Sequence, residues 1–301
     1  MTRRKRFVLQ LQSGTLALGE RTVVMGVLNV TPDSFSDGGK FFRLEDAVKE
    51  ALAMQRAGAD ILDIGAESTR PGSGGISAAE ELGRLLPVLQ ALRGRLKIPI
   101  SVDTQKASVA EVALGAGAQM VNDISGLKND PGIAEVVARF GAPLILMHMR
   151  GTPRTMQTGP FAKNAVRDVI SGLRKSAAAA QRAGVKRTQI VLDPGIGFGK
   201  SFAQNYELLA RLPELAKLGF PLLVGTSRKG FLGATLARQR KPVAASERIW
   251  GTAASVAASI LNGAHIVRVH DVEEMVQVAR VTDCVLQGSA ACSSSQKNPP
   301  L

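Results

Sequence analysis

Aromatic residues, cysteines and histidines are all scarce in this chain of 301 residues. Phenylalanine, tyrosine and tryptophan together make up 4 % of it. The two cysteines, Cys284 and Cys292, both lie near the end of the chain, so they cannot cross-link a fold, and no Cys/His spacing matches a zinc site. Three histidines leave few partners for a Ser/His/Asp triad, and a nucleophile elbow is missing. These absences argue against nucleophilic catalysis and predict a reduced, cytoplasmic location.

No segment has the pattern of a signal peptide or a membrane span. The basic run at residues 3–6 is followed by only three apolar residues before Gln10, so the apolar region of a signal peptide is missing. The uncharged stretch 249–267 is rich in Gly, Ala, Ser and Thr and contains Asn262 and His265. A buried helix followed by a strand explains this stretch better than a membrane span, and we expect no membrane partner.

Negative charge is the minority sign. There are 25 Asp and Glu against 38 Lys and Arg, a formal net charge of +13, and 45 % of the residues are hydrophobic. The hydrophobic fraction excludes disorder for the bulk of the chain. The basic excess is scattered and lacks the interleaved aromatics of a single-strand-binding surface. We therefore expect attraction of small anionic metabolites and no nucleic-acid partner.

One pattern recurs along the chain: an amphipathic helix, a glycine, then a short apolar run that ends in polar residues. The glycines that end these helices are Gly58, Gly117, Gly141, Gly184, Gly219 and Gly263. With the apolar runs at 23–30 and 98–104, the sequence has eight β-like runs separated by helical stretches. This count predicts an α/β fold, a (β/α)8 TIM barrel, with a doubly wound parallel sheet as the alternative.

The chain divides into three predicted parts. Residues 1–22 are a basic segment and a β-hairpin around Ser13-Gly14 that would plug the bottom of the barrel. Residues 23–287 form a single (β/α)8 catalytic domain, and residues 288–301 form a disordered tail.

All eight predicted strands end in polar side chains. In sequence order these are Asn29, Glu67, Asp103, Asn122 with Asp123, His148, Asp193, Ser227, and Arg268 with His270. Any one of them is explained by the exposure of a strand end, and for His148 we favour a structural role. As a set they predict a functional site, because the chemistry of a (β/α)8 barrel lies at the carboxyl ends of its strands.

Several loops at these ends have distinctive composition. The loops at 29–39 and 67–75 are rich in Gly and Ser, which is typical of mobile lids. The segment 193–201 ends in Gly-Lys-Ser, but Pro194 stands where a P-loop requires glycine, so a nucleotide phosphate loop is excluded. Segments 226–231 and 268–271 combine cations with a helix start and predict an anion site. The alternative for Arg268 is a structural ion pair with Asp271 or another rim carboxylate.

Eight ordered motifs together resemble the dihydropteroate synthase family over residues 23–285. They are Gly26–Gly39, Glu67–Gly72, Ser101–Thr104, Asn122–Gly126, Met147–Pro153, Asp193–Lys200, Ser227–Lys229 and Arg268–Asp271. The resemblance implies a transferase of folate biosynthesis. It would join 6-hydroxymethyl-7,8-dihydropterin pyrophosphate to p-aminobenzoate, after a Mg²⁺-assisted, dissociative loss of pyrophosphate. It also implies a homodimer and inhibition by sulfonamides.

The resemblance also implies a role for individual residues. The pterin would be bound by Asp103, Asn122, Ile124, Met147, Asp193, Phe198 and Lys229. The pyrophosphate would be bound by Asn29, Thr69, Arg70, Arg268, Val269 and His270, with Asn29 as the Mg²⁺ ligand. The p-aminobenzoate would be framed by Phe35, Thr69, Pro71, Phe198, Ser227, Lys229 and Gly230. Catalysis would involve Asp103, Lys229, Asp33 and Arg70, the two aspartates by stabilising a cationic pterin methylene.

Two departures and two rival functions accompany the resemblance. Gly230 stands where some relatives have serine, and residues 201–205 differ from the family's Thr-x-x-His-Asn, which puts a loop contact in doubt. One rival is a methyltetrahydrofolate-binding methyltransferase of the same barrel family, which would not need the segments 227–229 and 268–270. The other is a non-catalytic pterin-binding protein.

Overall fold

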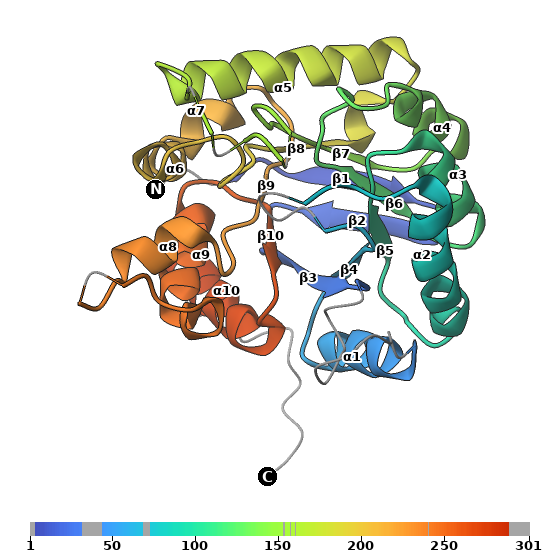
Figure 1. Ribbon diagram of the computed structural model, residues 1–301, viewed down its shortest axis with the longest axis horizontal. Helices are drawn as coiled ribbons and strands as arrows, with labels where there is room; N and C mark the ends of the chain where they lie inside the picture. Colours follow the sequence, from blue (N-terminus) through green and yellow to red (C-terminus); the bar gives the residue numbers. More distant parts are fainter. Residues whose placement is uncertain are drawn as a thin grey trace.

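The structure, a computed structural model, describes residues 4–31, 44–68, 73–152, 154–156, 158–159, 161–239 and 241–288. Eight parallel strands lie at its centre, helices surround them, and an antiparallel hairpin precedes them (Figure 1). Some predicted residues lie outside the described part of the chain, namely Asp33, Phe35, Thr69, Arg70, Pro71 and the tail 289–301.

After the hairpin, each barrel strand is followed by one or more helices. The hairpin strands are β1 (Phe7–Leu11) and β2 (Gly14–Leu18). The barrel strands are β3 (Val23–Asn29), β4 (Ile61–Gly65), β5 (Ile100–Asp103), β6 (Met120–Asp123), β7 (Leu144–Met147), β8 (Ile190–Asp193), β9 (Leu223–Val224) and β10 (Ile266–Val269). The α-helices are α1 (Leu44–Arg56), α2 (Ala78–Leu92), α3 (Ala107–Gly115), α4 (Gly132–Phe140), α5 (Ala165–Arg182), α6 (Phe202–Ala210), α7 (Leu212–Ala216), α8 (Gly230–Thr235), α9 (Ile249–Leu261) and α10 (Val272–Gln287). Two short 3-10 helices are η2 (Arg187–Gln189) and η3 (Ala245–Glu247).

The sheet closes on itself. Its hydrogen-bonded order is β8-β7-β6-β5-β4-β3-β10-β9. The two ends meet where Leu192 of β8 pairs with Leu222, just before β9, and the N–H of Leu192 donates to the carbonyl of Pro221 at 3.0 Å. This closure confirms the predicted (β/α)8 barrel and its N-terminal hairpin, and it excludes the doubly wound sheet.

The predicted helix ends are confirmed, with one difference inside a helix. The six glycines predicted to end helices all have positive φ angles. The helical stretch between β8 and β9 is split into α6 and α7. Pro213 has no N–H to donate to the carbonyl of Leu209, which accepts from Nδ2 of Asn262 at 2.9 Å instead. Among the helices in the described part of the chain, none is both long enough and apolar enough to cross a membrane.

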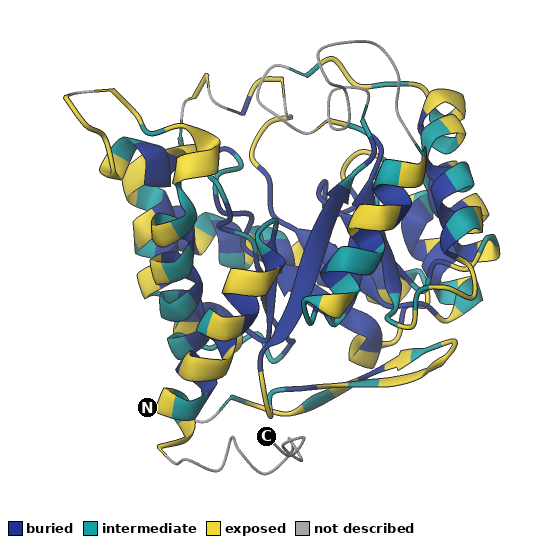
Figure 2. Ribbon diagram, turned by 90° about the horizontal axis from the view of Figure 1, so that it is seen from below, coloured by how far each residue is buried: buried dark blue, intermediate teal, exposed yellow. Residues whose placement is uncertain are grey.

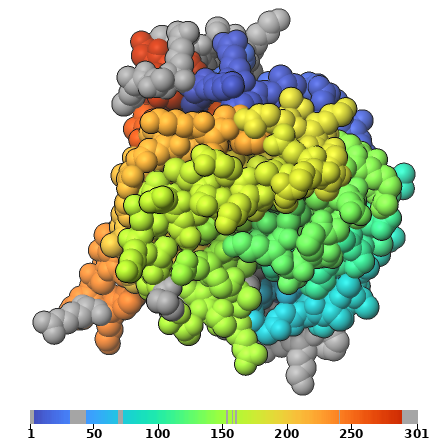
Figure 3. Space-filling view, turned by 90° about the horizontal axis from the view of Figure 1, so that it is seen from above, coloured from blue at the N-terminus to red at the C-terminus, as the bar shows by residue number. Residues whose placement is uncertain are grey.

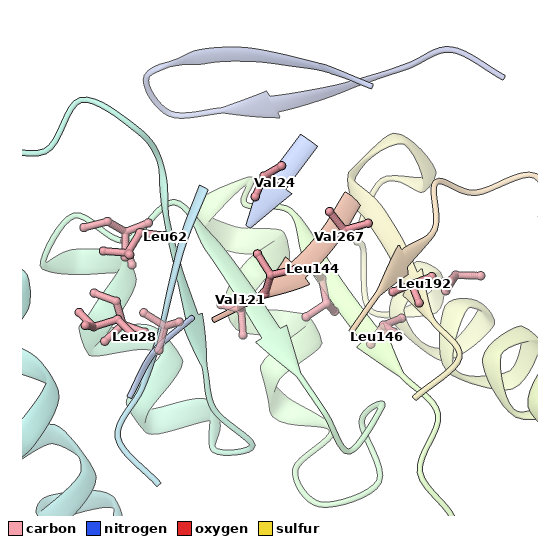
Figure 4. Close-up of a cluster of buried hydrophobic side chains, with 14 of the residues drawn as sticks. Val24, Leu28, Leu62, Val121, Leu144, Leu146, Leu192 and Val267 are labelled. Carbon is pink, nitrogen blue, oxygen red and sulfur yellow. The ribbon is translucent and has the colours of Figure 1, made fainter. Parts of the chain in front are cut away.

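Side chains on the barrel strands alternate between two apolar layers. Figure 4 shows members of the outer layer, which packs against the helices, such as Val24, Leu144 and Val267. Their neighbours in sequence point into the barrel and form the inner layer: Met25, Ile61, Met120, Ile145, Val191, Leu223 and Ile266. Leu9 and Leu18 of the hairpin complete this inner layer. The hairpin therefore plugs the lower end of the barrel, as Figure 2 shows.

A buried ion pair fixes the N-terminal arm to the last helix. The Arg4 side chain is 2 % exposed, and its Nη2 lies 2.5 Å from Oδ1 of Asp283, which is itself 5 % exposed. The same carboxylate accepts from the N–H of Thr22 at 2.6 Å and from its Oγ1 at 2.8 Å. Arg4 also donates to the carbonyl of Ala264 at 2.9 Å. This cluster locks the hairpin, the start of β3 and α10 together.

Arg4→Met is expected to lower the free energy of unfolding by about 3–5 kcal/mol, because the Asp283 carboxylate would stay buried without its charged partner. Arg6→Met is the matched control, since Arg6 pairs with Glu20 on the surface and both side chains are more than half exposed. Its loss should be about 0–1 kcal/mol. Urea denaturation of both variants measures the difference, and similar losses would contradict the assignment.

Candidate active site

The alternation that builds the inner apolar layer also builds a polar layer above it. Four barrel strands each carry a polar residue two positions after a residue of the inner apolar layer. These polar residues are Asp63, Asn122, Asp193 and Arg268, which follow Ile61, Met120, Val191 and Ile266 respectively. Because side chains on a strand alternate between faces, these four point into the barrel interior. The barrel is thus closed by apolar side chains next to the hairpin and lined by charged and amide side chains toward the carboxyl ends of its strands.

Arg268 is the centre of a hydrogen-bonded network across this polar layer. Its Nε donates to Oδ2 of Asp63 at 2.7 Å, and its Nη2 donates to Oδ2 of Asp103 at 2.8 Å. Asn122 Nδ2 donates to the same Asp63 oxygen at 3.0 Å. Arg268 therefore has a structural pairing, but with carboxylates inside the barrel. The alternative partner considered from sequence, Asp271, instead binds Arg228.

Asp63 was not among the predicted site residues. It is fully buried in the middle of the apolar strand β4. A buried carboxylate requires a charged or hydrogen-bonding partner. An aspartate in the middle of an apolar strand is therefore recognisable in the sequence as a candidate site residue. Within the described residues, Oδ1 of Asp63 and Oδ1 of Asn122 are buried without a hydrogen-bond partner. These two oxygens are suited to accept hydrogen bonds from the N–H groups of a ligand.

Burial alters the protonation of the two predicted aspartates. Burial raises the pKa of Asp103 to about 7, although the Arg268 guanidinium opposes the shift. Burial likewise raises the pKa of Asp193 to about 6. Oδ1 of Asp193 accepts from the N–H of Gly195 at 2.7 Å, which fixes the orientation of the carboxylate. At neutral pH Asp193 is therefore mostly ionised, and Asp103 lies close to its midpoint.

An apolar wall flanks the polar layer. Ile124 and Met147, both predicted, form a buried cluster with Met149 and Met156, and the predicted Phe198 packs against it. The two further methionines were not predicted, although Met149 lies inside a motif that was. Such a wall suits one face of a flat, weakly polar ring.

Lys229 lies over the ring of Phe198. Its Nζ is 3.9 Å from the ring centroid, within the range of a cation–π interaction. Burial, with the nearby positive charge of Arg268, lowers the pKa of Lys229 to about 8. Asp193 and Asp103 oppose this shift, so the ammonium lies in the field of both carboxylates.

Asn29 and Asp103 lie on either side of Gly65. The strand register aligns Asn29 of β3, Gly65 of β4 and Asp103 of β5. A Cβ at Gly65 would lie 3.6 Å from that of Asp103 and 3.8 Å from Oδ1 of Asn29. The glycine therefore leaves space beside both side chains. Among the described residues no group of three His, Cys, Asp or Glu side chains is arranged to hold a metal. The role of Asn29 as a Mg²⁺ ligand stays a prediction from the family resemblance.

Ser227 and His270 contact each other beyond the ends of β9 and β10, and β10 is the strand that pairs with β3 on the side away from β4. Ser227 Oγ accepts from the N–H of His270 at 3.2 Å and lies 3.0 Å from its Nδ1. Burial and the adjacent Arg268 lower the pKa of His270 to about 3. The imidazole is therefore neutral at pH 7. A Cβ on Gly230 would meet no atom within 4 Å, so this position opens into free space.

The β8–α6 loop, residues 194–201, packs tightly against the end of β7. Nζ of Lys200 donates to the carbonyls of His148, Pro194 and Gly195 at 2.7, 2.8 and 2.8 Å. A Cβ on Gly195 would overlap the His148 carbonyl oxygen, and one on Gly199 would overlap that of Arg150. The lysine of this glycine-rich segment therefore turns inward and organises the loop, in agreement with the exclusion of a phosphate loop.

The departure at residues 201–205 retains a loop contact. Ser201 and Gln204 form a reciprocal capping box at the start of α6, and Gln204 Nε2 donates to the carbonyl of Ala162 at 2.6 Å. Oδ1 of Asn205 accepts from the N–H of Gly197 at 2.6 Å. At this departure Gln204 thus joins the start of α6 to the segment before α5.

His148 points away from the barrel interior. Its ring packs on Gly172 of α5, and Nε2 lies 3.6 Å from Oδ2 of Asp168. Burial lowers its pKa far below the usual value. Helix α5 covers this side of the molecule, as the space-filling view in Figure 3 shows. The geometry agrees with the structural role favoured from sequence.

Comparisons with known proteins agree on one family. A family described as pterin binding enzyme matches residues 25–270. A dihydropteroate synthase of Synechocystis is 53 % identical over 267 residues, covering 89 % of this chain and 91 % of its own. The Yersinia pestis dihydropteroate synthase, solved as a sulfonamide drug complex, has a TM-score of 0.86 and 42 % identity over 94 % of this chain and 100 % of its own. The Burkholderia cenocepacia enzyme, solved with 7,8-dihydropteroate, has a TM-score of 0.82 and 41 % identity over 94 % and 97 %.

Alanine substitutions at Gly195 and Gly141 distinguish the cost of backbone strain from the cost of steric overlap. Their φ angles are 65° and 64°, but only at Gly195 would a Cβ overlap another atom. Gly141→Ala is expected to cost about 1–2 kcal/mol from the left-handed backbone alone. Gly195→Ala should cost roughly a further 1–3 kcal/mol from the overlap with His148. Denaturant unfolding of both variants provides the comparison, and equal losses would show that the loop does not pack as described.

Proposed function

This chain belongs to the dihydropteroate synthase family of pterin-binding transferases, and on that basis we propose that it makes 7,8-dihydropteroate for folate biosynthesis. It would join 6-hydroxymethyl-7,8-dihydropterin pyrophosphate to p-aminobenzoate and release pyrophosphate. The observation that carries the proposal is the ring of inward-facing Asp63, Asp103, Asn122 and Asp193 around one arginine, Arg268, with acceptor oxygens left over. The methyltransferase and the non-catalytic alternatives are not favoured, because the similar proteins named above are dihydropteroate synthases.

Pterin recognition follows from the donors and acceptors of the polar layer. The aminopyrimidinone edge of a pterin carries adjacent N–H groups, which the ionised Asp193 and the unpartnered Oδ1 of Asn122 would accept. Lys229 would donate to the ring carbonyl, while Asp103 would face the neighbouring ring nitrogens. Ile124, Met147 and Phe198 would cover the ring faces. A ring without this hydrogen-bonding pattern would leave buried groups unpaired and be rejected.

The leaving pyrophosphate would lie over the cations of the mouth. Arg268 supplies a planar guanidinium, and the neutral His270 supplies a ring N–H. Val269 contributes backbone between them, and Thr69 and Arg70 complete the set by resemblance. The amide oxygen of Asn29 suits Mg²⁺, which prefers oxygen ligands and commonly shares its coordination with substrate phosphates and water. When bound there, Mg²⁺ would neutralise charge on the leaving group.

Bond breaking would precede bond making. The C–O bond to pyrophosphate breaks and leaves a cationic pterin methylene, which the Asp103 carboxylate stabilises, with Asp33 added by resemblance. The p-aminobenzoate nitrogen then attacks the methylene carbon and loses a proton. Ser227, Lys229 and the open position at Gly230 would receive the acceptor's carboxylate. Phe35, Thr69 and Pro71 would frame the acceptor ring, where sulfonamides would compete.

We further propose a cytoplasmic homodimer. Helices α9 and α10 pack on each other and expose large apolar side chains: Trp250 is 80 % exposed, Val281 66 % and Val285 58 %. Apolar side chains this exposed are typical of a surface that a partner covers.

The direct test is an assay of the purified protein with the pterin pyrophosphate, p-aminobenzoate and Mg²⁺. Pyrophosphate release should require the pterin substrate, and dihydropteroate should form only when both substrates are present. Omission of Mg²⁺ should slow the reaction. A protein that binds pterin but forms no dihydropteroate would support the non-catalytic alternative instead.

Asp193→Asn is expected to lower kcat/KM for the pterin substrate at least about 30-fold, equivalent to about 2 kcal/mol, because an amide N–H would replace an acceptor. In the parent, the same parameter should begin to fall as the pH drops below about 7, where Asp103 becomes protonated, and should fall further below about 6, where Asp193 does. Glu111→Gln, in an exposed ion pair with Arg139, is the control and should leave kcat/KM unchanged. Parent-like kinetics in Asp193→Asn would remove this residue from pterin recognition.

Pyrophosphate is expected to raise the melting temperature of the parent protein, because it binds the native state selectively. Arg268→Ala should lose most of this increase. It should also melt lower without any anion, since Asp63 and Asp103 would lose their partner. Arg211→Ala is the control, because that arginine pairs with Glu207 and Glu214 on α6 and α7, outside the polar layer. An unchanged response to pyrophosphate in Arg268→Ala would assign this residue a structural role alone.

A further inference from the structure

One peptide group connects the buried Lys200 to the carboxylate of Asp193. The peptide that joins Pro194 to Gly195 has its N–H directed to Oδ1 of Asp193 at 2.7 Å. Its carbonyl oxygen, that of Pro194, accepts from Nζ of Lys200 at 2.8 Å. A cation on the oxygen of a peptide group polarises it and strengthens the hydrogen bond that its N–H donates. Lys200 thus acts on Asp193 through a single peptide plane.

The remaining donors of Lys200 hold the surroundings of that peptide. One goes to the carbonyl of His148 at the end of β7, and one to the carbonyl of Gly195, which also accepts from the N–H of Phe198 at 3.1 Å. Strands β7 and β8 are further joined by the N–H of His148, which donates to the carbonyl of Asp193 at 2.9 Å. The three N–H groups of the ammonium are therefore all used, and they connect the ends of two neighbouring strands.

Lys200 has no carboxylate within ion-pair distance among the described residues, so three carbonyl dipoles hold its charge. Burying an ammonium in this way is costly, and burial lowers the pKa of Lys200 to about 7. An apolar residue would avoid that cost but would leave the carbonyls of His148, Pro194 and Gly195 without this donor. The contacts that hold the loop are therefore also those that orient the Pro194–Gly195 peptide.

We propose that Lys200 is a positioning residue for pterin recognition, which orients the Asp193 carboxylate through the Pro194–Gly195 peptide and places Phe198 through the Gly195 carbonyl. The proposal rests on the pterin role proposed above for Asp193. Lys200 itself touches no substrate. Its replacement weakens binding of the pterin ring but not of pyrophosphate, because the hydrogen bonds that position Arg268 and His270 come from Asp63, Asp103 and Ser227, which lie outside the β8–α6 loop.

The test compares Lys200→Met with Lys128→Met. Lys128 is a matched control, because its Nζ donates to a single carbonyl, that of Met149, beyond the same strand end and outside the β8–α6 loop. Calorimetry measures the affinity of each variant for 6-hydroxymethylpterin and, separately, for pyrophosphate. Lys200→Met should lose at least about tenfold in pterin affinity while Lys128→Met stays within about twofold, and both should keep the parent affinity for pyrophosphate.

A pH profile distinguishes positioning from a general loss of structure. The cations that lower the Asp193 pKa are Lys229, Lys200 and Arg268. Removing the charge of Lys200 should raise that pKa further, so the acid limb of pterin binding moves to higher pH in Lys200→Met and affinity partly recovers at alkaline pH. The limb should stay at its parent position in Lys128→Met. A uniform loss of affinity at every pH would overturn the proposal.

The remaining outcomes are also decisive. Equal pterin affinities in Lys200→Met and Lys128→Met would overturn the proposal and leave the proposed function intact, whereas a parent protein that binds no pterin would overturn the proposed function itself. Lys200→Gln, which keeps a side-chain N–H donor, is the second variant if Lys200→Met does not fold. If neither variant melts cooperatively, Lys200 is a requirement of the fold and the positioning role is refuted.

Discussion

The ion pairs of Arg268 with Asp63 and Asp103 are the interaction on which the rest of the site depends. They place a cation at the centre of a barrel whose interior is otherwise apolar toward the hairpin. Each charge is tolerated there only because the others are present, since an isolated buried charge is expensive. Asn122 and Asp103 are held in the same network, which lies above the apolar layer next to the hairpin.

Much of this architecture can be predicted from the sequence, for physical reasons that differ between elements. Glycines such as Gly141 predict the end of a helix, because few other residues adopt a left-handed backbone at low cost. Strand-end residues such as Asp193 are predicted to be site residues, because the functional residues of (β/α)8 barrels lie at the carboxyl ends of the strands. Asp63 lies in the middle of β4, so the rule for strand ends does not identify it, although its spacing of two from Ile61 and Gly65 assigns it to the inner face.

Other features depend on contacts between distant parts of the chain and cannot be predicted from the local sequence. The inward turn of Lys200 requires the carbonyl of His148, which lies 52 residues earlier. The break between α6 and α7 is suggested by Pro213, but the partner that satisfies Leu209 is Asn262 in a later helix. The local sequence pattern predicts where a helix ends, whereas tertiary contacts decide which groups bind the unpaired backbone N–H and C=O groups at that end.

The anchor of the hairpin has a consequence for the order in which the molecule assembles. Arg4 and Asp283 are separated by 279 positions in the chain, so their contact closes a loop that contains all eight barrel strands. Asp283 leaves the ribosome after those strands, and the hairpin, although synthesised before them, cannot be locked onto the barrel until then. The lower end of the barrel can therefore be sealed only after α10 has been synthesised.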